Sequence, residues 1–270
     1  MDIFDKTELY FKEQKQFFGD YIFYESVLST SNQEINFMVN EEEHHSSKVK
    51  SEQGSTAQFH KNTTIEKETA IKDAIINEEW QKAETIDELR ELICNCKKCA
   101  LGNTRTNFVF GVGNPNAGIM VIGEAPGAEE DAQGEPFVGR AGQLLTKILA
   151  AINLPREEVF IANILKCRPP DNRKPLTSET DLCEPYLKKQ IELIKPKFIL
   201  ALGLTAVDTL LKKPHKMAET RGKLFDYCGT KMLVTYHPSA LLRNPNLKPA
   251  VWEDVKLLRR LYDESIAGGN

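Results

Sequence analysis

Four short apolar runs separate longer amphipathic stretches in the last two thirds of the chain. The runs at 119–122, 159–162, 198–202 and 232–235 predict buried strands. Apolar residues at helical spacing predict helices over 141–152, 178–194, 205–211 and about 249–262. Because strands that alternate with helices need crossover connections, we predict a three-layer α/β/α fold with a central, mostly parallel sheet of about four strands.

A further helix is predicted just ahead of this alternation. Thr85 and Glu88 form a capping-box pattern, and apolar residues follow at helical spacing. This helix leads directly to Cys96 and Cys99.

The first eighty residues have a different composition, in which polar and acidic residues dominate. We expect residues 1–80 to be an acidic, disordered extension and residues 81–266 to form the folded domain. The aromatic-rich opening, residues 9–24, is compatible with a short docking helix for a repair or replication protein. The alternative, which we favour, is a weakly helical tail that has no partner.

Charge is distributed unevenly along the 270 residues, whose net charge is -4. Residues 1–92 carry 10 Lys and Arg against 20 Asp and Glu, whereas residues 93–270 carry 25 against 19. A basic domain suits a phosphate backbone, although surplus surface lysines would give the same balance. The chain contains no run of eighteen apolar residues and no signal-peptide pattern, so we expect a soluble, intracellular monomer with no membrane contact.

Two loops at strand ends carry candidate chemistry. Gly-Glu-Ala-Pro-Gly at 123–127 follows the first strand, and Tyr-His-Pro-Ser-Ala-Leu-Leu-Arg at 236–243 follows the last. Open α/β sheets bind ligands at the carboxyl ends of their strands. The two glycines allow a tight turn against a flat ligand, and Glu124 adds a carboxylate.

Six cysteines in a chain of this class favour metal or catalytic use over disulfides. Cys96 and Cys99 have the two-residue gap that turns both sulfurs toward one centre, and Cys167 and Cys183 would complete four thiolates. Cys94 and Cys228 are left over. The chemistry alone leaves tetrahedral zinc and an iron–sulfur cluster equally open.

The two loops, the cysteine spacing and the segment Phe-Val-Gly-Arg-Ala-Gly at 137–142 together resemble the family 4 uracil-DNA glycosylases, over about residues 87–262. The resemblance implies a monofunctional hydrolase that flips uracil out of DNA, cleaves its N-glycosidic bond and leaves an abasic site in base excision repair. It also implies that Cys96, Cys99, Cys167 and Cys183 hold a [4Fe-4S] cluster.

The same resemblance assigns roles within the base pocket. Phe137 corresponds to the stacking aromatic, and the amide of Asn163 can accept from uracil N3–H while it donates to O4. His237 would stabilise the negative charge that develops on uracil O2.

Other matching positions concern DNA and the attacking water. Ser239 and Arg243 are expected to contact phosphate, and Leu241 or Leu242 either fills the gap left by the flipped nucleotide or packs within a helix. The best-known branch of the superfamily has an aspartate where this chain has Ala125. Water is therefore oriented either by Glu124 or by the backbone. Gly123 and Ala125 in the same loop are expected to bind the substrate.

Rejection of thymine must also differ from that branch, because Gly127 replaces its tyrosine. Glu130 is the candidate for this role.

Two other functions are compatible with parts of this pattern. A catalytically inactive DNA-binding or damage-sensing module of the same fold is disfavoured by the joint presence of Glu124, Phe137, Asn163 and His237. A branch that attaches covalently to the abasic product carries a histidine-rich insertion, whereas no other histidine lies between Arg221 and His237.

Overall fold

The computed structural model describes residues 78–268. The predicted acidic extension therefore lies outside the described residues, except for its last three positions. Trp80 is buried and packs edge-on against Tyr186, with ring centroids 4.9 Å apart. It belongs to the folded domain, one residue before the predicted boundary.

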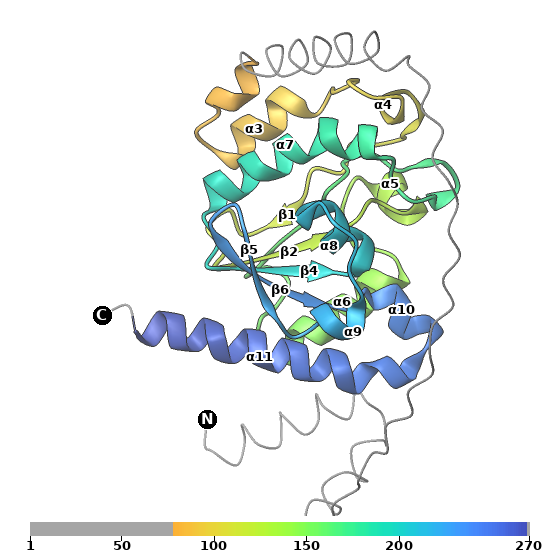
Figure 1. Cartoon of the computed structure of the whole chain (residues 1–270). Coiled ribbons are helices and arrows are strands. Elements are labelled where there is room, and N and C mark those ends of the chain that lie inside the picture. The colour runs from red at the N-terminus through yellow and green to blue at the C-terminus, as the bar shows by residue number, and fades with distance from the viewer. Residues whose placement is uncertain (1–77, 269–270) are drawn as a thin grey trace, which may run out of the picture. The chain divides into compact units, whose positions relative to one another are not determined.

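The described chain folds around one six-stranded sheet in the order β1-β3-β2-β4-β6-β5 (Figure 1). The strands are β1 Val112–Gly113, β2 Ile119–Gly123, β3 Phe160–Asn163, β4 Phe198–Leu202, β5 Leu224–Tyr227 and β6 Thr230–Thr235. The longer helices are α3 Ile86–Ile93, α6 Arg140–Ala150, α7 Thr177–Ile194, α8 Leu204–Leu211 and α11 Lys248–Ala267. The short helices are η2 Glu79–Lys82, α4 Leu101–Thr104, α5 Ala128–Gln133, η3 Pro170–Asn172, α9 Met217–Thr220, α10 Pro238–Arg243 and η4 Pro245–Leu247.

The predicted α/β class is confirmed. The four predicted strands form the parallel core β3-β2-β4-β6, and the edge strands β1 and β5 pair antiparallel to β3 and β6. The two edge strands were not predicted, so the sheet is larger than the expected four strands.

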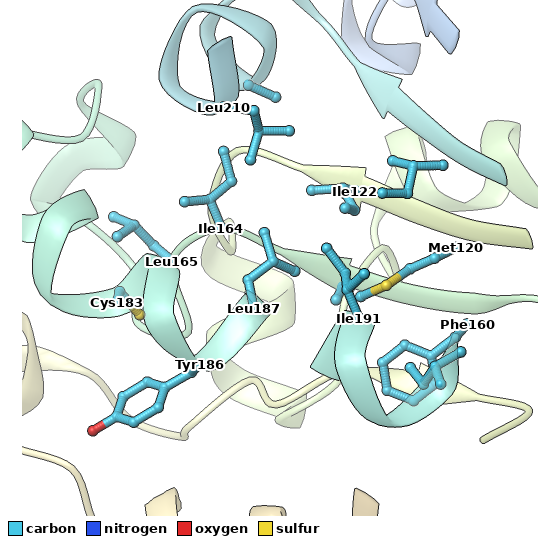
Figure 2. Packing of buried hydrophobic residues seen from close by; sticks show 14 of the residues in the cluster. Met120, Ile122, Phe160, Ile164, Leu165, Cys183, Tyr186, Leu187, Ile191 and Leu210 are labelled. Atoms are coloured by element: carbon cyan, nitrogen blue, oxygen red, sulfur yellow. The ribbon is translucent and has the colours of Figure 1, made fainter. Parts of the chain in front are cut away.

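Each central strand is buried on both faces, which separates the core into two layers. Alternate residues such as Met120 and Ile122 face the cluster that includes Leu187 of α7, whereas Ile119 and Val121 face the cluster that includes Leu145 of α6 and Leu258 of α11. Figure 1 shows α3 and α7 on one side of the sheet and α6 and α11 on the other, and Figure 2 shows the first of these layers. Strands buried on both faces read as continuous apolar runs, which is why they were found in the sequence.

A side-chain cap fixes where helix α3 begins. Thr85 caps α3 by accepting a hydrogen bond from the Glu88 backbone N–H at 3.2 Å, as the capping box predicts.

No helix within residues 78–268 is both long and apolar enough to cross a membrane.

The register of the parallel strands places functional loops side by side. Gly123 pairs with Asn163, and Leu202 pairs with Thr235. The carboxyl ends of β2, β3, β4 and β6 therefore meet at one edge of the sheet.

Candidate active site

A cavity of about 630 Å³ opens at this edge of the sheet. Nearly every pocket residue predicted from the sequence lines it, namely Glu124, Ala125, Glu130, Phe137, Asn163, His237, Ser239 and Arg243. The cavity therefore gathers side chains from β3, α5 and α10 and from the loops between these elements and the strands.

The side chains of Asn163 and Phe137 both pack closely against Gly123. A Cβ atom on Gly123 would lie 2.3 Å from Asn163 Oδ1 and 2.6 Å from Phe137 Cζ. Both distances are too short for real contacts, so the position requires glycine because of close packing. The predicted site residue Gly123 does not line the cavity itself, but it leaves room for two side chains that do.

Asn163 presents an unpaired acceptor to this region. The residue is 2% exposed, and its Oδ1 is a buried oxygen that no hydrogen-bond donor of the described chain satisfies. Leaving a buried acceptor unpaired costs about 1–3 kcal/mol. Such an atom at the wall of a cavity is suited to a ligand that brings an N–H group.

Phe137 stands opposite in a constrained backbone conformation. Its φ angle is +55°, in the left-handed region that non-glycine residues seldom adopt. A Cβ atom on Gly142 would lie 1.8 Å from the Phe137 carbonyl oxygen, so the glycine of α6 makes room for this turn.

Glu130 holds the loop that carries Phe137. Its Oε1 accepts from the backbone N–H groups of Val138 and Gly139, both at 3.1 Å, and its Oε2 accepts from Gly127 N–H at 3.1 Å. The carboxylate therefore fastens the first motif to the Phe137 turn. This clasp is a contact that the sequence did not indicate for Glu130.

His237 is the N-cap of α10, and its contacts fix its tautomer. Its Nδ1 accepts from the Ser239 backbone N–H at 3.2 Å and lies 2.8 Å from Ser239 Oγ. A backbone N–H can only donate, so Nδ1 carries the lone pair and Nε2 carries the proton of the neutral ring. Burial, followed by the positive charge of Arg243, lowers the pKa of His237 to about 4.

The backbone around His237 is equally confined. Gly203, at the end of β4, has φ +87°, and a Cβ atom there would lie 2.9 Å from the His237 Cβ. On another side, the ring centroid of Phe137 lies 5.6 Å from that of the His237 imidazole. The histidine therefore has little freedom to move.

Glu124 lies half-buried at the rim. Burial raises the pKa of its carboxyl group, and a hydrogen bond with Thr205 and the charge of Lys174 oppose that rise. Thr205 belongs to α8, and its part in the pocket was not recognised from the sequence. The only indication in the sequence was that Thr205 follows Gly203 closely at the end of a strand.

The basic loop after Cys167 also reaches the cavity through Pro169, Asn172 and Arg173. Arg173 makes a two-pronged ion pair with Glu179, with N–O distances of 2.6 and 2.9 Å. Its charge is therefore largely neutralised, and the pair anchors the loop to the start of α7.

The leucines of the last motif have different environments. Leu241 is 1% exposed and lies in the core, whereas Leu242 is 41% exposed. Only Leu242 is therefore placed to reach a ligand outside the domain.

The four predicted metal cysteines lie in one region beside α3 and α7. The charges of Cys96 and Cys99 act on Cys167, and those of Cys167 and Cys96 act on Cys183. Burial raises the pKa of the Cys167 thiol and raises that of Cys183 to about 12. Among residues 78–268, no three His, Cys, Asp or Glu side chains lie close enough to share a single metal ion.

Three hydrogen-bond donors point at these sulfurs. Arg105 Nη1 lies 3.0 Å from Cys167 Sγ, the Tyr186 hydroxyl 3.3 Å from Cys96 Sγ, and the Lys166 backbone nitrogen 3.4 Å from Cys183 Sγ. By contrast, Cys94 Sγ lies against the Glu91 carbonyl oxygen and Cys228 is exposed.

Comparison with known proteins places these features in context. The model of the uracil DNA glycosylase superfamily matches residues 110–256. The chain is 43% identical over 180 residues to a type-4 uracil-DNA glycosylase of Pyrobaculum aerophilum, which covers 64% of this chain and 92% of that protein. It is 44% identical over 187 residues to a type-4 enzyme of Sulfurisphaera tokodaii (66% and 85%) and 42% identical over 186 residues to one of Archaeoglobus fulgidus (66% and 94%).

Proposed function

The chain belongs to the uracil-DNA glycosylase superfamily, and on that premise we propose how its own residues excise uracil. The protein is a DNA-repair enzyme of the type-4 kind, which hydrolyses the N-glycosidic bond of uracil in DNA. The relatives are named as glycosylases, so the alternative of an inactive binding module is not favoured.

The observation that carries the assignment of roles is the unpaired Oδ1 of Asn163. Uracil has a donor at N3 and an acceptor at O4, which matches the oxygen and the nitrogen of an amide. Cytosine has an acceptor at N3 and a donor at N4, so it would leave the buried oxygen unpaired. Asn163 therefore reads uracil and rejects cytosine.

His237 supplies the donor for the leaving group. The contacts of its Nδ1 leave the proton on Nε2, where it can donate to uracil O2 as the glycosidic bond breaks. Because the pKa of His237 is about 4, the ring is neutral at neutral pH. It therefore acts as a neutral hydrogen-bond donor and not as a cation.

Glu124 is the group best placed to orient the attacking water. Its carboxyl group lines the cavity, and the hydrogen bond with Thr205 and the charge of Lys174 offset part of the rise in pKa that burial causes. An ionised carboxylate also stabilises a sugar that carries positive charge in the transition state. The backbone of the 123–127 loop is left to hold the base, with Phe137 as its stacking partner.

Glu130 fits the role of excluding thymine by placing its carboxylate behind Gly127. Its Oε2 would lie 2.6 Å from a Cβ atom on Gly127, so it occupies the space that a larger residue at position 127 would fill. A methyl group at C5 of the base would meet this fixed carboxylate.

We propose that the cysteine set holds an iron–sulfur cluster rather than zinc, because the chain belongs with the type-4 enzymes. Tetrahedral zinc with bonds of about 2.3 Å would bring its sulfurs to about 3.8 Å from one another. The charges of Cys96 and Cys99 act on Cys167, and those of Cys167 and Cys96 act on Cys183, so the four side chains lie in one region. When bound, a [4Fe-4S] cluster would cross-link the four segments and could exchange an electron. Arg105, Tyr186 and the Lys166 amide would then donate to its thiolates.

Excision from defined oligonucleotides tests the function. Purified protein should release uracil from DNA and leave cytosine and thymine in place, as read by cleavage of the abasic product. A folded preparation that retains every base would refute the assignment.

A further inference from the structure

Lys166 is a fully buried lysine that no part of the proposed reaction uses. Its exposure is 0%, and its ammonium group donates to the main-chain oxygen of Asn163 at 2.8 Å and to Gln190 Oε1 at 2.7 Å. Gln190 is also completely buried, and its Nε2 donates to the Phe110 carbonyl oxygen at 3.0 Å. The ammonium therefore joins the base-reading residue to α7.

The cost of this arrangement indicates that the charge has a use. Burying an ammonium group costs several kcal/mol unless it is compensated, and both hydrogen-bond acceptors of Lys166 are neutral oxygens. Among the described residues, only the charges of Cys183 and Cys167 oppose the effect of burial on its pKa. Methionine would fill the same space without that cost. What methionine could not do is hold the carbonyl of Asn163 at the end of β3.

Asn163 needs such support because its side-chain Oδ1 has no hydrogen-bond partner among the described residues to hold it in place. Hydrogen bonds from Ile164 N–H to the Gly123 carbonyl and from Leu165 N–H to the Glu124 carbonyl fix the residues that follow it. The Asn163 carbonyl is fixed by Lys166 instead. The distance between Asn163 Oδ1 and the flipped base thus depends on the Lys166–Gln190 link.

We propose that Lys166 is a positioning residue for base recognition, which holds the Asn163 main chain so that its amide meets the uracil edge. This inference rests on the proposed role of Asn163. It assigns Lys166 no contact with the base and no proton transfer.

A double-mutant cycle tests the proposal. We expect Lys166→Met to lower single-turnover excision of uracil about 10- to 100-fold, because a misplacement of about 1 Å can cost that much. The same substitution should have almost no further effect in an Asn163→Ala background, where there is no amide left to position. Iron content and thermal unfolding are measured on each variant.

Lys189 offers a matched control on α7. It is also largely buried, but its ammonium pairs with Glu192 at 2.8 Å, away from Asn163. Lys189→Met should leave excision within about twofold of the wild type, since a pair with an exposed carboxylate contributes little.

Two results would overturn the proposal, namely wild-type excision by Lys166→Met, or losses that simply add in the double variant. If Lys166→Met does not fold, Gln190→Met serves in the same cycle, because it removes the other end of the link. Gln190→Met should then show a smaller loss with the same lack of additivity. Inactive wild-type protein would instead refute the proposed function, which separates the two failures.

Discussion

The state of His237 is decided by its immediate neighbours. Burial and the charge of Arg243 disfavour the protonated ring, and the Ser239 backbone N–H occupies its Nδ1. The sequence indicated a histidine held by a rigid proline after a strand. It could not indicate the tautomer, because that depends on a hydrogen bond formed only when α10 is in place.

This environment predicts how stability varies with pH. The folded pKa of about 4 lies below the ordinary 6.5, so between these values the unfolded chain binds a proton that the folded chain does not. Stability should therefore fall as pH falls from 6.5 toward 4, and not above 6.5. By pH 4.5 the loss due to His237 should be about 2–3 kcal/mol, at about 1.4 kcal/mol per pKa unit.

Urea unfolding of the wild type and of His237→Asn at pH 7.5 and 4.5 measures this contribution. Carboxylates titrate in both proteins, so only the difference between them reports on His237. Equal losses of stability in the two proteins would show that the histidine is not buried in its neutral form.

At the scale of elements, two adjacent leucines of helix α10 have different surroundings. Leu241 is in the core and Leu242 is exposed. We expect Leu241→Ala to reduce the free energy of unfolding by about 2–5 kcal/mol. Leu242→Ala should change it by less than about 0.5 kcal/mol, yet slow excision from duplex DNA, where a gap must be filled, more than excision from single strands.

Chemical denaturation and paired duplex and single-strand assays distinguish the two leucines. If Leu242→Ala slows both substrates equally, then Leu242 does not fill the gap in the duplex. The sequence left both residues open, because two neighbouring leucines on a short helix give no period from which to choose.

The elements that bury the most apolar surface were the ones that the sequence predicted. The central strands and the helices α6, α7, α8 and α11 were predicted to within a few residues, because their apolar patterns are long. Strand β1 has only two residues, and β5 is mostly exposed or half-exposed. Helix α5 buries only Asp131, whose carboxylate binds the Thr106 backbone N–H. Such elements are held by tertiary contacts that carry no local pattern.

The pocket was predictable for a different reason. Its residues were found by their resemblance to known motifs, and the sheet register then brings Gly123 beside Asn163. The contributions of Thr205, Lys166 and the Arg173–Glu179 pair were missed. Each is a contact between segments that are distant in the chain or that lack a recognised motif.

At the scale of the whole molecule, the four cysteines of the proposed cluster come from segments separated by almost ninety residues. Serine at Cys96, Cys99, Cys167 or Cys183 should reduce iron content and destabilise the domain. Anaerobically purified wild type should hold about four irons per chain. Cys94→Ser and Cys228→Ser are the controls, and both should keep their iron.

Metal analysis of the wild type and the six variants checks this assignment. Stoichiometric zinc without iron, in protein expressed with sufficient iron, would exclude the cluster. Loss of iron from the Cys94 or Cys228 variant alone would show that the ligand set is wrong.

The central claim is that Asn163 reads uracil while His237 stabilises its departure, and it is tested most directly by single-turnover excision and equilibrium binding on the same oligonucleotides. Asn163→Asp should excise uracil far more slowly and discriminate less well against cytosine. His237→Ala should lose about 10²- to 10³-fold in the chemical step, the scale for one oxyanion donor, and retain its binding and its discrimination. Wild-type rates in His237→Ala, or unchanged discrimination in Asn163→Asp, would contradict the account.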